Sequence, residues 1–187
     1  MPSPPNLDTR ARAFALRYAA LFSNPDASDP DRVGALARAI GAFYRPGMTM
    51  FTHGQIARFA VRRLPSLPSP PPTLPTFAAD KSPQTQAEAA ALIEREMRNN
   101  IASGLGTKLV LEAVEKVELY APTSALCWLR WRFEPAAGSA FAGRGWEMVN
   151  VYGFRAGDGE GGGDGWELVL RDQEVEAMRA VTGGTFE

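Results

Sequence analysis

Hydrophobic and polar residues alternate most regularly toward the C-terminal end of the chain, where two stretches predict long strands. One face of the first stretch, Gly145–Arg155, carries Trp146, Met148, Asn150, Tyr152 and Phe154. The matching face of the second stretch, Trp166–Glu176, carries Trp166, Leu168, Leu170 and then Asp172. Alternation with a period of two is typical of antiparallel strands that are buried on one face. We therefore expect a hairpin closed by the Gly/Asp-rich turn between the two stretches.

The N-terminal part of the chain instead has the apolar spacing of amphipathic helices. The first predicted helix begins near Asp8, which we expect to cap it, and ends at Asn24-Pro25. The second begins at Asp29-Pro30, an acidic cap followed by a proline in the first turn. Their apolar faces are Ala11, Phe14, Tyr18, Leu21 and Phe22 in the first, and Val33, Leu36, Ala37 and Ile40 in the second.

The middle of the chain predicts a short strand, a short helix and a proline-rich insertion. The strand is Phe43–Phe51, and the helix is Gln55–Arg63. Residues 64–83 form the insertion, because repeated prolines favour extended chain without ladder hydrogen bonds. Arg62–Pro68 within this region matches a P-x-x-P docking segment, although a solvated surface loop explains the same residues.

A third, longer helix and two further strands follow. The helix is Thr85–Ser103, which opens with a capping box formed by Thr85 and Glu88 and stops before Gly104. Lys108–Tyr120 fits either a helix or a strand, and its β-branched content favours a strand. Ser124–Glu134 alternates cleanly, and Glu174–Val181 suggests a short helical tail. Helices followed by a strand meander predict an α+β domain, in which a curved antiparallel sheet wraps round the N-terminal helices as a cone with an internal pocket.

Composition excludes several function classes. The chain has 187 residues, 45% of them hydrophobic, which predicts a single domain spanning 1–187. A net charge of -1 argues against nucleic acid as a partner. Cys127 is the single cysteine, and we find neither a secretory signal nor an apolar run that would span a membrane, so we expect a cytoplasmic protein.

No cofactor or metal is predicted. The sequence has no His/Cys/Asp/Glu cluster with ligand spacing, no P-loop and no dinucleotide-binding glycine motif. The run Gly157–Gly165 resembles one calcium-binding nonapeptide repeat, but a single copy does not build that structure, so we interpret it as a hairpin tip.

Two polar residues interrupt the apolar strand faces and are candidates for a site. Asp172 follows three apolar in-phase residues, and a carboxyl group that faces an apolar cavity can exchange protons near neutral pH. The alternative is a strand-end aspartate bonded to backbone or paired with Arg171 or Arg155. Asn150 can orient a substrate carbonyl or a water molecule, or it can be a buried amide that satisfies a bulge.

With this order of elements, the chain resembles the nuclear transport factor 2-like superfamily, which includes SnoaL-like cyclases, scytalone dehydratase and limonene epoxide hydrolase. The resembling stretches are Met148–Arg155 and Trp166–Asp172, which look like the closing strands of that superfamily. The catalytic sets of the two named enzymes do not carry over, because this chain has one histidine and lacks the hydrolase's Asp-Arg-Asp spacing. The resemblance implies a homodimer formed through the outer face of the sheet, where Trp128, Arg130 and Arg132 are expected.

The remaining candidate residues complete a functional hypothesis. His53 is the one imidazole of the chain, a group that titrates near neutral pH, and is either a second proton carrier or structural. Tyr18, Tyr44 and Tyr152 are candidate substrate-binding residues with Asn150, or core residues. The resemblance implies a cofactor-free SnoaL-like isomerase, cyclase or dehydratase that acts on a small apolar oxygenated metabolite, such as a polyketide or terpenoid, with Asp172 as acid and base. A non-catalytic binding or interaction scaffold is the alternative.

Overall fold

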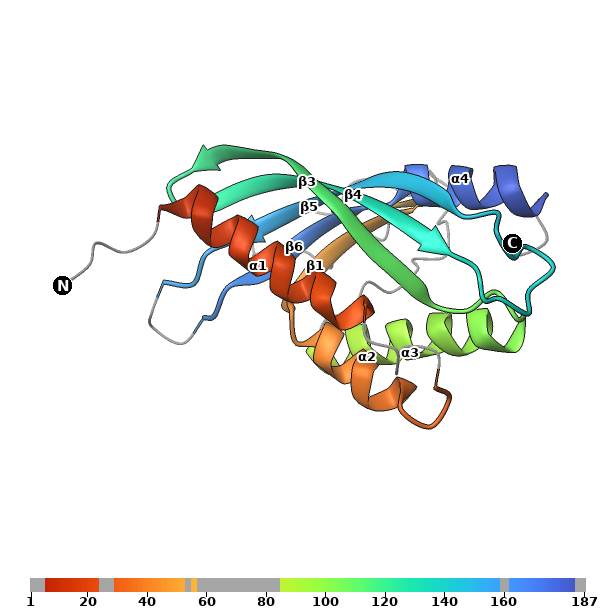
Figure 1. Cartoon of the computed structure of the whole chain (residues 1–187). Helices are drawn as coiled ribbons and strands as arrows, with labels where there is room; N and C mark the ends of the chain where they lie inside the picture. Colours follow the sequence, from red (N-terminus) through yellow and green to blue (C-terminus); the bar gives the residue numbers. More distant parts are fainter. Residues whose placement is uncertain (1–5, 24–28, 53–54, 57–84, 159–161, 184–187) are drawn as a thin grey trace, which may run out of the picture.

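A computed structural model describes residues 6–23, 29–52, 55–56, 85–158 and 162–183 of the chain. In order, its elements are α1 (Leu7–Phe22), α2 (Val33–Gly41), β1 (Tyr44–Thr52), β2 (Gln55–Ile56), α3 (Gln86–Ala102), β3 (Lys108–Ala121), β4 (Ser124–Glu134), β5 (Trp146–Arg155), β6 (Gly165–Leu170) and α4 (Asp172–Thr182). The strands form one sheet in the order β2-β1-β6-β5-β4-β3. The sheet curves over α1, α2 and α3 (Figure 1). The predicted α+β class is confirmed.

The strand connections differ from the prediction in one respect. Strands β3, β4, β5 and β6 form an antiparallel meander, as expected, with Leu129 opposite Asn150 and Cys127 opposite Tyr152. Strand β1 instead runs parallel to β6, with Met50 opposite Val169. Strand β2, helix α3 and three further strands separate β1 from β6 in the chain, and so long a connection lets β1 pair with the free edge of β6 in either direction. The alternation of side chains within β1 therefore did not indicate whether the pairing is parallel or antiparallel.

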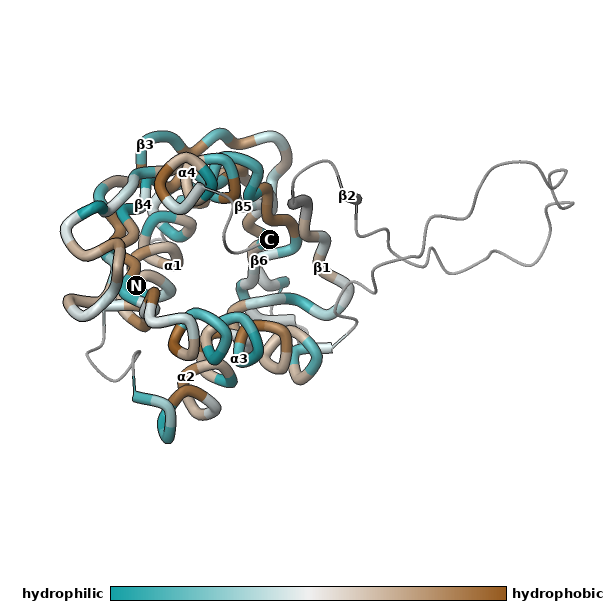
Figure 2. The backbone as a smooth tube through the Cα atoms, turned by 90° about the vertical axis from the view of Figure 1, so that its right-hand side faces the viewer, coloured by the Kyte–Doolittle hydropathy of each residue, from teal (hydrophilic) through white to brown (hydrophobic). Residues whose placement is uncertain are grey.

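Alternating side chains of β4 and β5 build the core against the helices. In β5 the inward residues Trp146, Met148, Asn150, Tyr152 and Phe154 are all buried, as the alternation predicted. From α1, Phe14 packs edge-on to Trp166 with the ring centroids 4.9 Å apart. Burial of a large apolar side chain contributes about 1.5–3 kcal/mol, so this aromatic layer is a main source of stability. The end-on view shows α3 across from β5 and β6, with α1 closing one side (Figure 2).

The helix starts were predicted well at α3 and less well at α1 and α2. Thr85 caps α3 by accepting a hydrogen bond from the Glu88 amide at 3.1 Å, which confirms half of the predicted capping box. Helix α1 is capped by Asn6, whose Oδ1 accepts from the Thr9 amide, so the expectation that Asp8 is the cap is wrong. Asp8 pairs with Arg12 instead.

Helix α2 begins at Val33, later than the predicted start at Asp29-Pro30. Asp29 accepts from the Asp31 amide at 2.9 Å, and its carbonyl accepts from the Val33 amide. The acidic cap therefore organises a turn just ahead of the helix. Beyond β1, residues Gln55–Ile56 pair with that strand as β2, so the helix predicted from Gln55 does not begin there. The proline-rich insertion, its P-x-x-P segment and His53 lie outside the described residues.

The largest correction concerns the last predicted strand, Trp166–Glu176. Strand β6 ends at Leu170, and the chain turns directly into helix α4 at Asp172. The acidic first turn favours the helix through its dipole, and Gly183, with a φ of +67°, ends it. Residues beyond Leu170 therefore follow a helical period, which changes the side chains that face inward.

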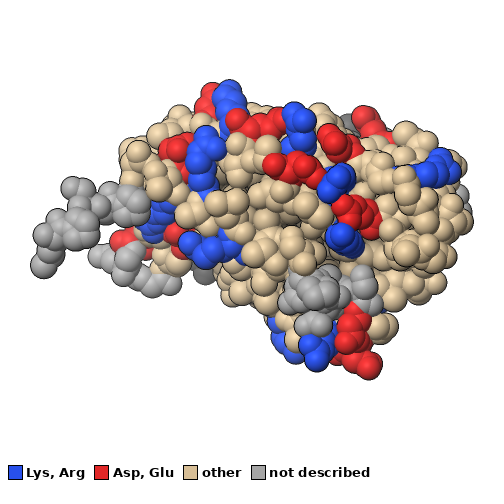
Figure 3. Space-filling view, viewed as in Figure 1, with Lys and Arg blue, Asp and Glu red and all other residues tan. Residues whose placement is uncertain are grey.

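On the side of the molecule that Figure 3 shows, charged side chains of both signs gather over β3 and β4. Arg130 pairs with Glu115 across β3 and β4, and Arg132 pairs with Glu112 at 2.9 Å. Trp128 is half-buried, with the Lys116 ammonium 4.9 Å from its ring centroid. Within the described ranges, no helix is long and apolar enough to cross a membrane.

Candidate functional site

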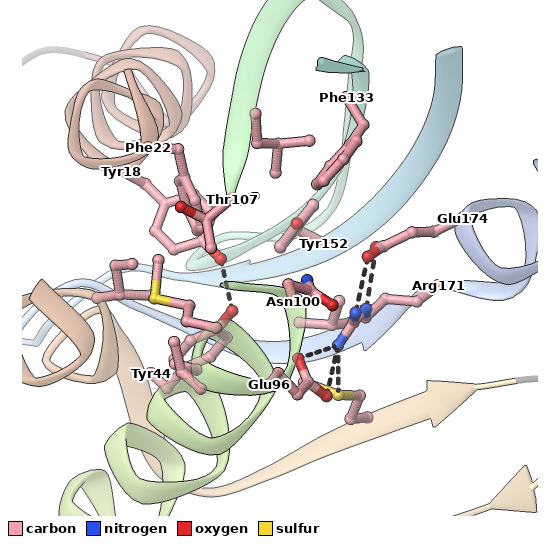
Figure 4. Close-up of a pocket in the computed structure, with 16 residues that line it drawn as sticks. Tyr18, Phe22, Tyr44, Glu96, Asn100, Thr107, Phe133, Tyr152, Arg171 and Glu174 are labelled. Atoms are coloured by element: carbon pink, nitrogen blue, oxygen red, sulfur yellow. Dashed lines mark hydrogen bonds and ion pairs between the residues drawn. The ribbon is translucent and has the colours of Figure 1, made fainter. Parts of the chain in front are cut away.

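A cavity of about 100 Å³ lies between the inner face of the sheet and helices α1, α2, α3 and α4 (Figure 4). Its aromatic lining is Tyr18, Phe22, Tyr44, Phe133 and Tyr152. Its charged lining is Glu96, Arg171 and Glu174. Asn100 and Thr107 add polar groups, and aliphatic and methionine side chains complete the wall. An apolar wall with a few convergent polar groups is typical of small-molecule sites.

Three buried tyrosines stand on one part of this wall. Tyr18 comes from the inner stripe of α1, Tyr44 begins β1, and Tyr152 lies on the inner face of β5. The hydroxyl oxygens of Tyr18 and Tyr44 are 2.5 Å apart, and the Tyr18 and Tyr152 ring centroids are 5.7 Å apart. Burial raises the pKa of Tyr44 to about 12 and also raises the pKa of Tyr18 and of Tyr152. All three phenols are therefore neutral hydrogen-bond donors at physiological pH.

Arg171 lies on the opposite part of the wall, at the junction of β6 and α4, between two carboxylates. Its Nε and Nη2 donate to the two oxygens of Glu174 at 3.0 and 2.7 Å. Its Nη1 donates to Oε2 of Glu96 on α3 at 3.1 Å. The Arg171 side chain is 20% exposed, and a guanidinium at that depth requires such partners. Figure 4 shows this cluster facing the Tyr18–Tyr44 pair, with Tyr152 between them.

Asn150 orients the carboxylate of Glu174 through a hydrogen bond. Its Nδ2 donates to Oε2 of Glu174 at 2.8 Å, and the residue is 1% exposed. Burial by itself would raise the pKa of Glu174, but the charge of Arg171 and the hydrogen bonds from Arg171 and Asn150 outweigh it, so that pKa is lowered. Glu174 is therefore ionised at neutral pH.

The cavity thus combines neutral donors with an ionised carboxylate. The phenols can donate to an oxygen atom of a bound molecule, and a carboxylate can accept a proton from it. Among the described residues, no group of three or more His, Cys, Asp or Glu side chains gathers at a potential metal site. Arg171, which separates the two carboxylates of the cavity, leaves no place for a cation between them.

Solved structures provide the comparison for this architecture. A domain of unknown function with a cystatin-like fold from Nostoc punctiforme matches over 90% of this chain and 77% of its own, with a TM-score of 0.52 and 15% identity. The chain has a cystatin-like fold. An NTF2-like protein from Novosphingobium aromaticivorans, also with a cystatin-like fold, matches over 88% and 79% of the two chains (TM-score 0.48, 15% identity). A candidate SnoaL-like polyketide cyclase from Jannaschia matches over 97% and 98% (TM-score 0.46, 13% identity).

Sequence comparisons add nothing to this assignment: no family model and no curated protein matches this chain. At identities this low, the structural likeness establishes the fold and leaves the activity to be argued from the site.

Within this fold, several residues that the sequence singled out do meet at the cavity. Tyr18, Tyr44 and Tyr152 line it, and Asn150 lies behind its carboxylate. Asp172 does not line it: the side chain is exposed in the first turn of α4, because the strand that was to direct it inward ends at Leu170. The interpretation of Asp172 as a carboxylate facing the cavity is therefore corrected, and Glu174 occupies that position.

Sequence reasoning missed the charged cluster, although a signal for part of it was present. Glu96 and Asn100 fall on the same stripe of α3 as Ile93 and Met97. A polar residue in phase with an apolar face was the criterion that selected Asn150, and applied to α3 it would have selected Glu96. Arg171 and Glu174 had no such signal, because their orientation follows from the switch between strand and helix.

Proposed function

We propose that this protein is a cofactor-independent catalyst of proton transfer, of the isomerase, cyclase or dehydratase type, on a small, largely apolar, oxygenated molecule. The observation that supports this proposal is the pairing, in one mostly apolar cavity, of neutral phenol donors with an ionised carboxylate. An enclosed space of about 100 Å³ is smaller than the roughly 150 Å³ that holds benzene in an engineered cavity. A larger polyketide or terpenoid would therefore insert one end and leave the rest outside.

The proposed chemistry begins with a carbonyl oxygen hydrogen bonded to the phenols. Glu174 takes a proton from the carbon next to the carbonyl, the electron pair moves to the oxygen, and Tyr152 with the Tyr18–Tyr44 pair stabilises the enolate. Return of the proton from Glu174 to another carbon completes an isomerisation. For a dehydration, protonated Glu174 would instead give its proton to a hydroxyl group on the β-carbon, which leaves as water while the enolate electron pair forms the C=C bond.

Hydrogen exchange on a simple ketone tests the first step without knowledge of the natural substrate. Cyclohexanone is incubated with the protein in D₂O, and the loss of its α-protons is followed by NMR. We expect Glu174→Gln to slow protein-dependent exchange by about 100-fold or more, the usual contribution of a general base. Tyr152→Phe should slow it by about 100-fold to 1000-fold through loss of one oxyanion donor.

Asp172→Asn is the matched control, because Asp172 is exposed on the same helical turn. The proposal expects the exchange rate to be unchanged in this variant. Loss of exchange in Asp172→Asn with full activity in Glu174→Gln would reverse the assignment. If the wild-type protein exchanges the α-protons no faster than heat-denatured protein does, the proposed proton transfer is wrong.

A second candidate function is ligand binding without turnover. It is favoured by the three hydrogen bonds that already engage the Glu174 carboxylate, two from Arg171 and one from Asn150, since a carboxylate held in this way is a weak base. Native mass spectrometry after incubation with a metabolite extract separates the two candidates. A retained ligand that returns unchanged supports a carrier, and a converted ligand supports an enzyme.

A homodimer through the outer sheet face also remains a proposal. The alternating charges of that face, such as Arg130 with Glu115 and Arg132 with Glu112, are self-complementary in principle. The Lys116 ammonium lies over the Trp128 ring on that face. Sedimentation of the wild type and of Trp128→Glu tests the interface: a dimer that becomes a monomer in the variant supports it, and a wild-type monomer removes it.

A further inference from the structure

The two carboxylates that hold Arg171 are bound in different ways. The Glu174 carboxylate accepts a bidentate pair of hydrogen bonds from Nε and Nη2 of Arg171, and a third hydrogen bond from Nδ2 of Asn150. Glu96 receives both of its contacts from one nitrogen, Nη1, at 3.3 and 3.1 Å. Its side chain is 43% exposed, against 24% for Glu174. Glu174 is thus a fixed part of the wall, whereas Glu96 is the more loosely held partner.

Glu96 occupies the place that a ligand carboxylate would need. Guanidinium groups recognise carboxylates through their paired N–H donors, and the Nη1 donors of Arg171 within the cavity point to Glu96 (Figure 4). Nε and one side of Nη2 are taken by Glu174. A ligand carboxylate would have to displace Glu96 to bind Nη1 of Arg171.

The charge balance of the cluster works against such a ligand. One guanidinium and two carboxylates sum to a charge of -1, and the other polar groups on the wall, the tyrosines with Asn100 and Thr107, are neutral. Two like charges in contact repel each other more strongly in a partly buried site than in water, because the effective dielectric constant is lower there. An uncharged carbonyl or hydroxyl compound avoids this repulsion and can still accept from the phenols.

We propose that Glu96 is the specificity-determining residue of the cavity: by filling the carboxylate position on Arg171, it makes the cavity accept uncharged oxygenated molecules and reject carboxylic acids. This inference rests on the proposed function, because it presupposes that the cavity binds a ligand. It adds the charge class of that ligand and the residue that selects it. Glu96 acts through its hold on Arg171 and is not required for the proton transfer.

A matched pair of ring compounds tests the inference. Cyclohexanone and cyclohexanecarboxylate are titrated into the full chain at pH 7.5, and the dissociation constants are measured by ligand-observed NMR. For the wild type we expect the carboxylate to bind at least about tenfold more weakly than the ketone. Glu96→Ala, which frees Nη1 of Arg171, should raise the affinity for the carboxylate relative to the ketone by at least about tenfold. One lost or gained charge contact contributes on the order of 1.4 kcal/mol or more.

Two further variants separate charge from shape. Glu96→Asp keeps the negative charge and should still reject the carboxylate. Glu94→Ala removes a carboxylate from the same helix that pairs with Arg98 rather than with Arg171, and it should behave as the wild type. Circular dichroism of each variant confirms that it is folded before its binding is compared.

Each outcome decides the inference. Equal binding of ketone and carboxylate to the wild type, or unchanged selectivity in Glu96→Ala, overturns it. If neither compound binds the wild type, the ligand cavity and this inference both fail. If cyclohexanone binds with the expected selectivity but shows no deuterium exchange, the proton-transfer proposal fails and the selectivity assignment stands.

Discussion

The hydroxyl oxygens of Tyr18 and Tyr44 lie 2.5 Å apart, joining helix α1 to the first residue of β1 at the wall of the cavity. Both side chains are buried, and the two rings meet nearly at right angles with their centroids 6.0 Å apart. In this pair one hydroxyl donates to the other, which leaves one O–H to donate to a ligand while both groups stay protonated. The titration of the pair therefore has consequences for stability and for binding.

We predict that stability falls as the pH rises above 10. Burial raises the pKa of Tyr44 from 10 to about 12, so the unfolded chain loses this proton first. The contribution of Tyr44 is complete below pH 10 and is lost between pH 10 and about 12, by up to about 3 kcal/mol. Urea unfolding at several pH values measures the effect. Tyr44→Phe should have a shallower pH dependence over this range, and an identical slope in wild type and variant would contradict the assignment.

Glu174→Gln is expected to destabilise the fold at neutral pH. Breaking a buried ion pair costs about 3–5 kcal/mol, and the partial exposure of Glu174 and Arg171 favours the lower end of that range. Because the pKa of Glu174 is lowered in the folded chain, its contribution is present above the unfolded pKa near 4.5 and is lost as the pH falls below it. The variant should therefore lose less stability than the wild type between pH 5 and pH 3.

The control for that experiment is Glu176→Gln, since Glu176 is an exposed residue on the same helix. We expect its free energy of unfolding to stay within about 0.5 kcal/mol of the wild type, as is usual for a surface substitution. A loss of stability equal to that of Glu174→Gln would mean that helix charge, rather than the contact with Arg171, is responsible.

Gly41→Ala should loosen the contact between α2 and α3. A Cβ added at Gly41 would lie 2.8 Å from the Cβ of Ala90 and 3.0 Å from its backbone nitrogen, so the helices would have to separate. Overpacking of this kind costs about 1–3 kcal/mol. Thermal unfolding measures the loss. Gly138→Ala is the matched control, because a Cβ added there would meet nothing within 4 Å, and an equal loss in both variants would contradict the packing argument.

Cys127 provides a probe for opening of the core around β4. The residue is fully buried in β4, and burial raises the pKa of its thiol to about 12. Labelling by a disulfide reagent at pH 8 therefore requires the core to open, and we expect it to be at least about a thousandfold slower than in urea, given a folding free energy of about 5 kcal/mol or more. Complete labelling within minutes under native conditions would show that β4 is accessible.

Most of the elements could be predicted from the sequence because the signals were local. The alternation in β4 and β5 depends on neighbouring residues along one strand, and the Thr85 cap depends on an amide three residues away. The same locality explains the error at Asp172. The alternation of the strand was assumed to continue beyond Leu170. The acidic residues that follow it and the spacing of Val175 and Met178 instead suit a helix.

The site was predicted in part for the same reason. Tyr18, Tyr152 and Asn150 were found because each lies in phase with an apolar stripe, and periodicity reports which face is buried. Tyr44 was found as an aromatic residue that suits the core. The pairings among them were not predictable. Tyr18 and Tyr44 are joined across two elements, and their contact depends on the angle at which α1 crosses the sheet.

The amino-acid pattern alone determined the α+β class, the inward faces of the strands and the limits of α3, because these follow from periods and caps within a few residues of chain. Tertiary structure decided the parallel docking of β1 on β6, the exposure of Asp172 and the cluster around Arg171. Arg171 and Glu96 are 75 residues apart in the sequence. An arginine near a strand end is ordinarily solvated, and it becomes part of a cavity wall only where folding brings two carboxylates from separate helices to its guanidinium group.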